Sequence, residues 1–303
     1  VVPKVNSGKV RRLGTRVVER VMGSGTSARI SDLLALGNQS TSNSSACSTG
    51  TEAVIEAALR IRQGLATRMV AGGAEGSSVY TWSGFDSMRV LARKYNDQPE
   101  KGSRPMSATA TGFVPGAGAG ALLLEDLESA QARGARIYAE VQGVMVNCGG
   151  HRNGGSMTAP NPEGARRCIQ GALADAGISP DAVDAINGHL TATYADPHEM
   201  TNWAGALGRE PSDFPYINST KSMIGHCLGA AGAIEGVASV LQLDRGFMHP
   251  SINCEDIHPE IAPFESAIVR ECMDFPQLQT LAKASFGFGD VNSCLILKKW
   301  NDK

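Results

Sequence analysis

Strand-like and helix-like segments alternate along this 303-residue chain, and that alternation constrains its fold more than any other feature. The segments typical of strands are 68–71, 120–127, 135–147, 183–187 and 215–220, followed by two strands around a glycine turn within 282–300. The segments typical of helices include 162–177 and 228–246, and a short polar helix is expected between the second and third strands. Alternation with short connections predicts an α/β protein of layered sheets and helices.

Composition narrows the class of protein. The chain is long enough, and at 42% hydrophobic residues apolar enough, for one large or two medium domains. A formal net charge of −2 gives no basic field for nucleic acid or a membrane surface, and no apolar run is long enough to cross a bilayer. The seven cysteines are scattered, without a C-x-x-C pair, and the first residues do not resemble a signal peptide. These features predict a cytoplasmic protein with reduced thiols and no metal site.

Cys47 lies in the stretch NSSACSTGTEAVIEAALRIRQG, between small polar residues and a segment with helical spacing that ends at Gly64. The N-terminus of a helix presents unpaired N–H groups and a partial positive charge, which lower the pKa of a thiol. The stretch therefore fits a nucleophile. It fits a buried cysteine in a tight turn equally well.

Two further segments place histidines just after predicted strands. NGHLTAT contains His189, and NSTKSMIGHCLGAAGAIE contains Lys221, His226 and Glu235. Each histidine alone fits a structural role. A thiolate together with two imidazoles forms a workable site for acyl transfer.

These motifs together resemble those of the β-ketoacyl-ACP synthases of the I/II type, which are decarboxylating condensing enzymes of the thiolase-like superfamily. SSACSTG matches the nucleophile motif, NGHLTAT the His-Gly-Thr-Ser-Thr loop, STKSMIGH the Lys-His segment and SFGFG the gating loop. The resemblance implies an α/β, thiolase-like αβαβα fold with two mixed sheets around buried helices. Residues 1–130 would hold the nucleophile and 131–303 both histidines. The resemblance also implies that the N-terminal portion of the family's fold is missing from this sequence.

The resemblance also implies roles for the reacting groups. Cys47 would carry the acyl chain as a thioester, and His189 and His226 would stabilise the enolate that forms when malonyl-ACP loses carbon dioxide. Lys221 and Glu235 would hold the histidines and water. On this assignment His226→Ala would still load Cys47 but would release little carbon dioxide.

Substrate contacts follow from the same resemblance. The N–H groups of Cys47 and Phe288 would form the oxyanion hole, and Phe286 and Phe288 would gate the acyl pocket. Thr191 and Thr193 would bind the pantetheine arm. The basic residues proposed to dock an acidic acyl carrier protein are Lys9, Arg11 and Arg12.

The implied partners are acyl carrier protein with its acyl and malonyl thioesters, and a second copy of the chain in a homodimer. No cofactor is expected beyond the phosphopantetheine of the carrier, and no nucleic acid or membrane is expected as a partner. The polar stretch QSTSNSSA, residues 39–46, is the segment expected to pair as a strand near the dimer interface. The expected reaction belongs to fatty acid or polyketide chain elongation.

The departures from the family pattern include Leu190, Ala192 and Asp290, a loop one residue shorter before Asp196, and the stretch MSATATGF, which lacks the usual charged residues. An ionised Asp290 near the thioester would repel the developing oxyanion, so that Asp290→Gly would raise the rate or broaden the acyl lengths accepted. If Asp290 instead caps a turn, the same substitution would only lower stability.

The sequence alone leaves two other functions open. A non-catalytic or weakly active partner subunit of a condensing-enzyme heterodimer would typically lack the cysteine, whereas Cys47 is present. A CoA-dependent thiolase-like acyltransferase would need a second reactive cysteine near the C-terminal glycine loop, and Cys294 lies in the strand beyond that loop.

Overall fold

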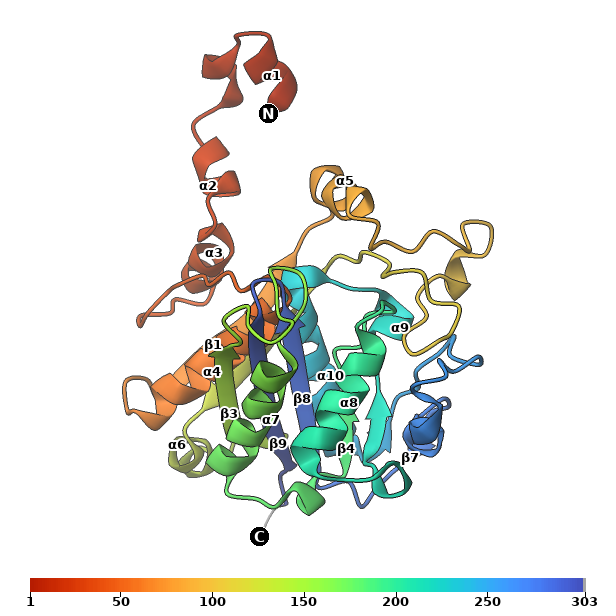
Figure 1. The fold of residues 1–303 in the computed structure, drawn as a ribbon. Coiled ribbons are helices and arrows are strands. Elements are labelled where there is room, and N and C mark those ends of the chain that lie inside the picture. The colour runs from red at the N-terminus through yellow and green to blue at the C-terminus, as the bar shows by residue number, and fades with distance from the viewer. Residues whose placement is uncertain (302–303) are drawn as a thin grey trace. The chain divides into compact units, whose positions relative to one another are not determined.

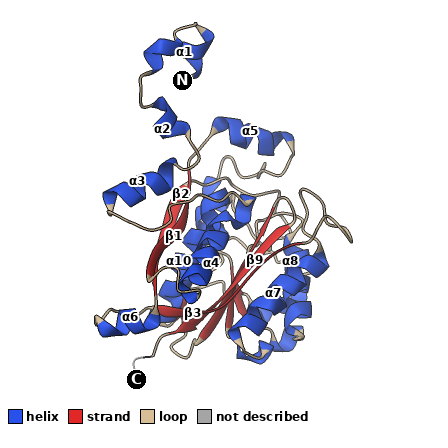
Figure 2. Cartoon of the chain, turned by 90° about the vertical axis from the view of Figure 1, so that its left-hand side faces the viewer, coloured by secondary structure: helices blue, strands red, loops and turns tan. Residues whose placement is uncertain are grey.

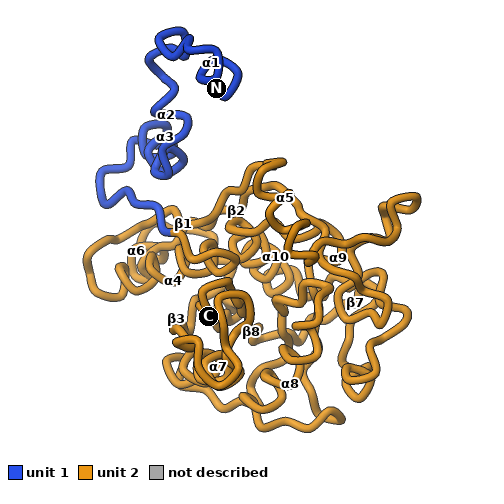
Figure 3. The backbone as a smooth tube through the Cα atoms, turned by 45° about the horizontal axis from the view of Figure 1, so that its top comes forward, with its two compact units in different colours: residues 1–43 blue, residues 44–303 orange. Residues whose placement is uncertain are grey.

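The structure is a computed structural model that describes residues 1–301. Two compact units divide the chain, Val1–Asn43 and Ser44–Lys303, and are coloured separately in Figure 3. The first unit contains only short helices: α1 Val2–Asn6, η1 Val10–Leu13, α2 Val17–Val21 and α3 Gly25–Leu33. Among residues 1–43 only Gly25 is buried, so this unit has almost no core of its own. The division into halves at residue 130 stays a prediction.

The larger sheet of the second unit has five strands in the order β3-β9-β8-β4-β5. Their bounds are β3 Ala139–Cys148, β4 Ala185–Asn187, β5 Tyr216–Asn218, β8 Thr280–Gly287 and β9 Val291–Lys299. Strand β9 is antiparallel to both of its neighbours, β3 and β8. Strand β4 is parallel to both β5 and β8, so the sheet is mixed. The strands expected from the sequence are confirmed.

The second sheet is an antiparallel pair, β1 Arg68–Glu75 with β2 Gly118–Glu125, and a third pair joins β6 Phe247–Met248 to β7 Met273–Asp274. The family resemblance implied two mixed sheets. Within residues 1–301 the sheet nearer the N-terminus is this antiparallel pair alone.

Two helices lie between the two main sheets, α4 Thr49–Arg62 and α10 Ala231–Arg245 (Figures 1 and 2). Helix α4 packs against both sheets, because its Val54 and Ile55 share one core cluster with Leu124 of β2 and Leu295 of β9. The opposite face of the five-stranded sheet is covered by α7 Pro162–Ala176 and α8 Asp196–Leu207 (Figure 2). The layered arrangement of sheets around buried helices is therefore confirmed.

The remaining helices are short. They are η2 Ala46–Ser48, α5 Val79–Ser87, η3 Pro99–Lys101, α6 Leu127–Ala132, η4 Pro180–Ala182, η5 Pro211–Asp213, α9 Lys221–Ile224, η6 Leu228–Ala230 and η7 Ala262–Ala267. The longest helices, α7 and α10, have 15 residues each. Across residues 1–301 no helix combines the length and apolar character needed to cross a membrane.

Small residues allow α4 and α10 to cross at close range. A Cβ added at Gly50 would lie 2.6 Å from the backbone nitrogen of Ala233, and one added at Gly232 would lie 2.1 Å from Oγ1 of Thr51. Both distances are far below van der Waals contact, so neither position accepts a side chain without movement of a helix. The crossing brings the segment that carries Cys47 against the segment that follows His226.

Candidate active site

Cys47 lies in the 3₁₀ turn η2, immediately before α4, as expected from the sequence. Ala46 has a φ of 48°, a left-handed conformation that alanine rarely adopts and that turns the chain sharply into the helix. Ser48 anchors the turn, because its Oγ donates to the carbonyl oxygens of Ser285 and Val291, each at 3.1 Å. The cysteine is therefore held against the hairpin of β8 and β9.

The two histidines approach the thiol from different elements. His189 follows β4, and His226 lies between α9 and η6. Nε2 of His226 lies 3.1 Å from Sγ of Cys47, and the two imidazole rings are 5.3 Å apart at an angle of 87°. One ring nitrogen of each histidine and the Cys47 sulfur all lie within 4.8 Å of one another. The structure thus brings together the three groups that the sequence selected.

Hydrogen bonds define the tautomer of each ring. The Leu228 N–H donates to Nδ1 of His226 at 3.2 Å, and the Lys221 ammonium lies 3.4 Å from Nδ1 of His189. Because Nδ1 accepts in both rings, each neutral ring carries its proton on Nε2. Burial, followed by the charge of Lys221, holds the pKa of both histidines well below its ordinary value, so both are neutral at pH 7.

The same tautomers bear on metal binding. Cys47, His189 and His226 place three donor atoms close enough for one metal ion. A metal on Nε2 requires a lone pair there, and so a proton on Nδ1, which in both rings already faces an N–H donor. The arrangement suits two Nε2–H groups that donate to a substrate oxygen better than it suits metal ligation.

The Cys47 thiol differs from the sequence-based expectation. Burial raises its pKa to about 11, while the Lys221 charge and the Phe288 N–H lower it without cancelling that effect. The prediction that the helix start lowers the pKa of this thiol was therefore wrong in its net result. Desolvation of the sulfur outweighs the partial charge of the helix terminus.

This property predicts the pH dependence of Cys47 alkylation. Because only the thiolate reacts, the rate of modification by iodoacetamide should rise about tenfold per pH unit from about pH 7 to pH 9.5, without a plateau. Free cysteine, with a pKa of about 8.5, should level off in the same range and serves as the reference. The rate is measured by peptide mass spectrometry, and a plateau for Cys47 below pH 8 would contradict the structure.

Behind the histidines lies a buried cluster of three charges. Lys221 forms an ion pair with Oε1 of Glu235, and Lys283 lies 2.7 Å from Oε2 of the same carboxylate. All three side chains are at most 2% exposed. Lys221 and Glu235 were expected to hold the histidines, and the direct contact is with His189. Lys283 was not identified from the sequence, although a lysine inside the apolar strand segment TLAKASFG is itself a signal.

The loop that carries His189 is held by two buried carboxylates. Glu199 accepts the backbone N–H groups of His189 at 2.6 Å and of Leu190 at 2.7 Å, and burial raises the pKa of Glu199 to about 7. Asp196 accepts the N–H groups of Thr191 and Ala192. The loop therefore accommodates the two residues that differ from the family motif. Leu190 is fully buried, and the contact of the Ala192 N–H with Asp196 holds Ala192 at a φ of 63°.

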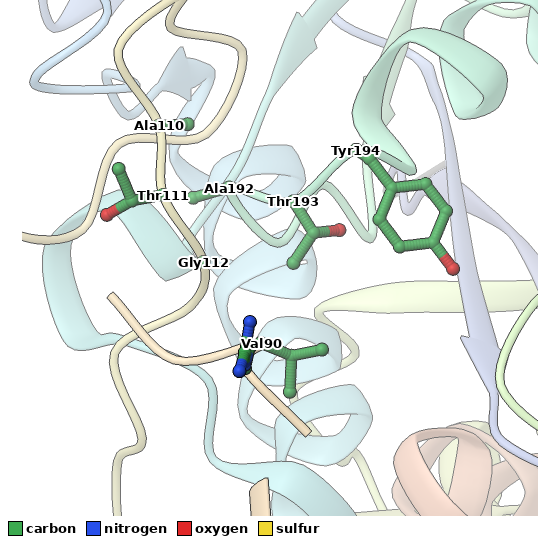
Figure 4. A pocket seen from close by; sticks show the side chains of 8 residues that line it. Val90, Ala110, Thr111, Gly112, Ala192, Thr193 and Tyr194 are labelled. Atoms are coloured by element: carbon green, nitrogen blue, oxygen red, sulfur yellow. The ribbon is translucent and has the colours of Figure 1, made fainter. Parts of the chain in front are cut away.

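An open pocket of about 240 Å³ adjoins this loop (Figure 4). Its lining residues are Arg89, Val90, Ala110, Thr111, Gly112, Ala192, Thr193 and Tyr194. The hydroxyl of Thr193 lies 2.9 Å from that of Thr191. The two threonines selected from the sequence are thus neighbours, and Thr193 lines the pocket.

Aromatic side chains lie beside the two histidines. The Phe286 ring lies 6.2 Å from the His189 ring, and the backbone N–H groups of Phe288 and Cys47 both interact with the Cys47 sulfur. Phe85 and Phe113 were not identified from the sequence. Their rings link Phe288 to His226 through successive centroid distances of 6.0, 5.2 and 5.2 Å. Both phenylalanines directly follow a glycine, at 84–85 and 112–113, and this Gly-Phe pair is the sequence signal that could have identified them.

Asp290 does not face the thiol. Its carboxylate is fully buried and accepts the backbone N–H groups of Asn161 at 2.7 Å and of His151 at 2.9 Å. It therefore ties the turn between β8 and β9 to the segment 149–161. The hypothesis that this charge opposes the oxyanion is wrong, because both carboxylate oxygens are directed at this segment, and the alternative that Asp290 caps a turn is the one observed.

Asp290→Gly is accordingly expected to lower stability and to leave acyl selectivity unchanged. Loss of two buried hydrogen bonds, partly offset by glycine's preference for the left-handed φ of 60°, should reduce the free energy of unfolding by about 1–3 kcal/mol. Urea denaturation measures this, with Asp290→Asn as a control that keeps one acceptor. A mutant of wild-type stability with altered chain-length preference would contradict the assignment.

The basic residues Lys9, Arg11 and Arg12 are exposed around η1 in the first unit. Their proposed docking role remains a prediction. Residues 39–45 form no strand, and the expected pairing of the segment 39–46 at a dimer interface stays a prediction. Cys294 is fully buried in β9, and burial raises its pKa to about 12, which makes it unsuited to serve as a second reactive thiol.

Comparison with known sequences identifies the family. Residues 4–130 match the N-terminal domain of beta-ketoacyl synthase, and residues 138–255 match its C-terminal domain. The chain is 39% identical over 293 residues to 3-oxoacyl-[acyl-carrier-protein] synthase 1 of Haemophilus influenzae, which covers 96% of this chain and 69% of the relative.

Solved structures agree with the sequence matches. A beta-ketoacyl synthase from Burkholderia phymatum superposes with a TM-score of 0.90 at 32% identity, covering 99% of this chain and 71% of that one. A type II PKS acyl-carrier protein in complex with its ketosynthase gives a TM-score of 0.88 at 30% identity, covering 95% of this chain and 70% of that one. The fold, the cysteine with its two histidines, and these matches lead to one conclusion: the chain belongs to the beta-ketoacyl synthase family.

Proposed function

We propose that this chain is an acyltransferase that condenses a Cys47-bound acyl group with malonyl-ACP, with loss of carbon dioxide, in fatty acid or polyketide chain elongation. The observation that carries the proposal is the approach of the thiol and two imidazole nitrogens to within 4.8 Å of one another. A thiol supplies the covalent carrier, and two neutral Nε2–H donors supply the site for an anionic oxygen.

The first step transfers the acyl group. The Cys47 thiolate attacks the carbonyl carbon of an acyl-carrier thioester, and the resulting oxyanion is held by the N–H groups of Cys47 and Phe288. The carrier thiol leaves with the proton that Cys47 gave up. Because burial raises the pKa of Cys47 to about 11, the Nε2–H group of His226, 3.1 Å from the sulfur, is the donor that favours the reactive thiolate.

The second step forms the carbon–carbon bond. His189 and His226 donate to the thioester oxygen of the malonyl group, the carbon–carboxylate bond breaks, and its electron pair forms an enolate as carbon dioxide leaves. The enolate carbon attacks the Cys47 thioester. The carbon–sulfur bond to Cys47 then breaks, the β-ketoacyl product remains on the carrier, and the Cys47 thiolate takes up one proton.

The carrier and the assembly belong to the same proposal. The solved neighbour that contains an acyl-carrier protein supports a carrier as partner, with Thr191 and Thr193 binding its pantetheine arm. The exposed basic residues Lys9, Arg11 and Arg12 suit an acidic carrier surface. We further propose a homodimer in the cytoplasm that needs no metal and no cofactor beyond the carrier's phosphopantetheine.

The two alternative functions are less well supported. A non-catalytic partner subunit does not need the nucleophile and both imidazoles in contact, and here Cys47 and His226 are 3.1 Å apart. A thiolase needs a second accessible thiol, and Cys294 is fully buried.

The function is tested by incubating the chain with acyl-ACP and malonyl-ACP and analysing the carrier by intact-mass spectrometry. The proposal expects a carrier that has gained the acyl chain plus two carbons as a β-keto thioester, together with one equivalent of carbon dioxide. Product formed from acyl-CoA and acetyl-CoA without release of carbon dioxide would favour the thiolase alternative.

A further inference from the structure

Lys283 occupies an unusual place for a lysine. It lies in the middle of β8, a strand buried along its whole length, and its side chain is 0% exposed. Three oxygen atoms surround its ammonium: Oε2 of Glu235 at 2.7 Å, the Ala284 carbonyl at 2.6 Å and Oγ of Ser285 at 2.7 Å. A buried ammonium is stable only with such partners, so Lys283 is held in one position.

Glu235 connects Lys283 to the histidine loop. Its second oxygen is paired with Lys221, and Nζ of Lys221 lies 3.4 Å from Nδ1 of His189. The contacts therefore form a chain in the order Lys283, Glu235, Lys221 and His189. If Oε2 of Glu235 lost its partner, the carboxylate could turn, and Lys221 would move with it.

The other side of Lys283 leads to the nucleophile. Oγ of Ser285 lies 2.9 Å from Oγ1 of Thr51, in the first turn of the helix that follows Cys47. Lys283 is thus linked to His189 through Glu235 and Lys221, and to the first turn of the helix that follows Cys47 through Ser285. The cluster also places two lysine side chains on one carboxylate, and burial together with the charges of both lysines lowers the pKa of His189 and His226.

We propose that Lys283 is a positioning residue for the condensation: it orients Glu235 so that Lys221 donates to Nδ1 of His189 and leaves the His189 proton on Nε2. The effect of Lys283 on the His189 tautomer is independent of the proposed function. Only its effect on decarboxylation rests on that function. The charged or titratable groups around His189 are Cys47, His226, Lys221, Lys283, Glu235 and Glu199. Burial, followed by the charges of Lys221, His226 and Lys283, lowers the pKa of His189.

His226 provides an internal comparison. Its Nδ1 accepts from the backbone N–H of Leu228, which does not depend on the lysines. Loss of Lys283 should therefore disturb the tautomer of His189 and leave that of His226 unchanged. Damage to general packing would affect both rings.

The test is ¹⁵N NMR of the histidine rings, which separates the two tautomers without any substrate, in wild type, Lys283→Met and the control Lys298→Met. Lys298 lies on β9, outside the cluster. In Lys283→Met we expect a second tautomer of His189 only, and a decrease in malonyl-ACP decarboxylation of at least about tenfold, with acyl loading of Cys47 changed less than about threefold. Lys283→Gln, which keeps a donor near Glu235, should recover part of the loss.

Identical His189 signals in folded Lys283→Met and Lys298→Met would overturn the proposal. If Lys283→Met does not fold, Glu235→Gln breaks the same chain of contacts, and an unchanged His189 tautomer there would overturn it equally. Because the NMR reading uses no acyl substrate, it stands whether or not the chain carries out the proposed condensation.

Discussion

Replacing Cys47 with alanine is expected to abolish acyl loading and to lower condensation by at least about a thousandfold, because the covalent carrier of the acyl chain is lost. No other thiol in residues 1–301 lies within 4.8 Å of both histidines, as the Cys47 sulfur does. The measurement is β-ketoacyl-ACP formed per minute from acyl-ACP and malonyl-ACP.

The matched control is Cys272→Ala, which removes an exposed thiol outside the site. It should retain wild-type activity, and both variants should melt at a similar temperature. Condensation above one tenth of the wild-type rate in Cys47→Ala would rule out a covalent role for this cysteine.

Alanine at either histidine should have the second largest effect, and the two should differ. His189 has no direct contact with the thiol among the described hydrogen bonds, so His189→Ala should still load Cys47 while decarboxylation falls by about 10²–10⁴-fold. Nε2 of His226 lies 3.1 Å from the sulfur, so His226→Ala should lose both steps. This revises the sequence-based expectation that His226→Ala would still load.

Loading is followed by the mass of the acyl-enzyme and decarboxylation by release of labelled carbon dioxide from malonyl-ACP. His198→Ala, at an exposed position of α8, is the control and should leave both rates unchanged. Equal losses of loading in His189→Ala and His226→Ala would contradict the division of roles.

Features with a strong local pattern could be predicted from the sequence. The apolar strand segments and the helix ending at Gly177, which adopts a φ of 65° as its cap, appear where the pattern placed them. Cys47, His189 and His226 could be selected because each follows a predicted strand or precedes a predicted helix, and such positions in layered α/β folds meet at one edge of a sheet.

Features that depend on long-range packing could not be predicted in the same way. The direction of the Asp290 carboxylate depends on its contacts with Asn161 and His151, more than 100 residues away in sequence. The pKa of Cys47 depends on how much of the sulfur is buried between elements, and a local helix-terminus argument omits that desolvation. Lys283 became significant only once Glu235 was placed beside it.

The most direct test of the account is the site of acylation. The chain is incubated with acyl-ACP alone, digested and mapped by tandem mass spectrometry, and malonyl-ACP is then added to a parallel sample. We expect the acyl mass on the peptide containing Cys47 and its disappearance within one turnover of malonyl-ACP addition, with the extended chain appearing on the carrier. An acyl group on Cys227 or Cys294 with Cys47 unmodified, or an adduct on Cys47 that malonyl-ACP does not discharge, would contradict it.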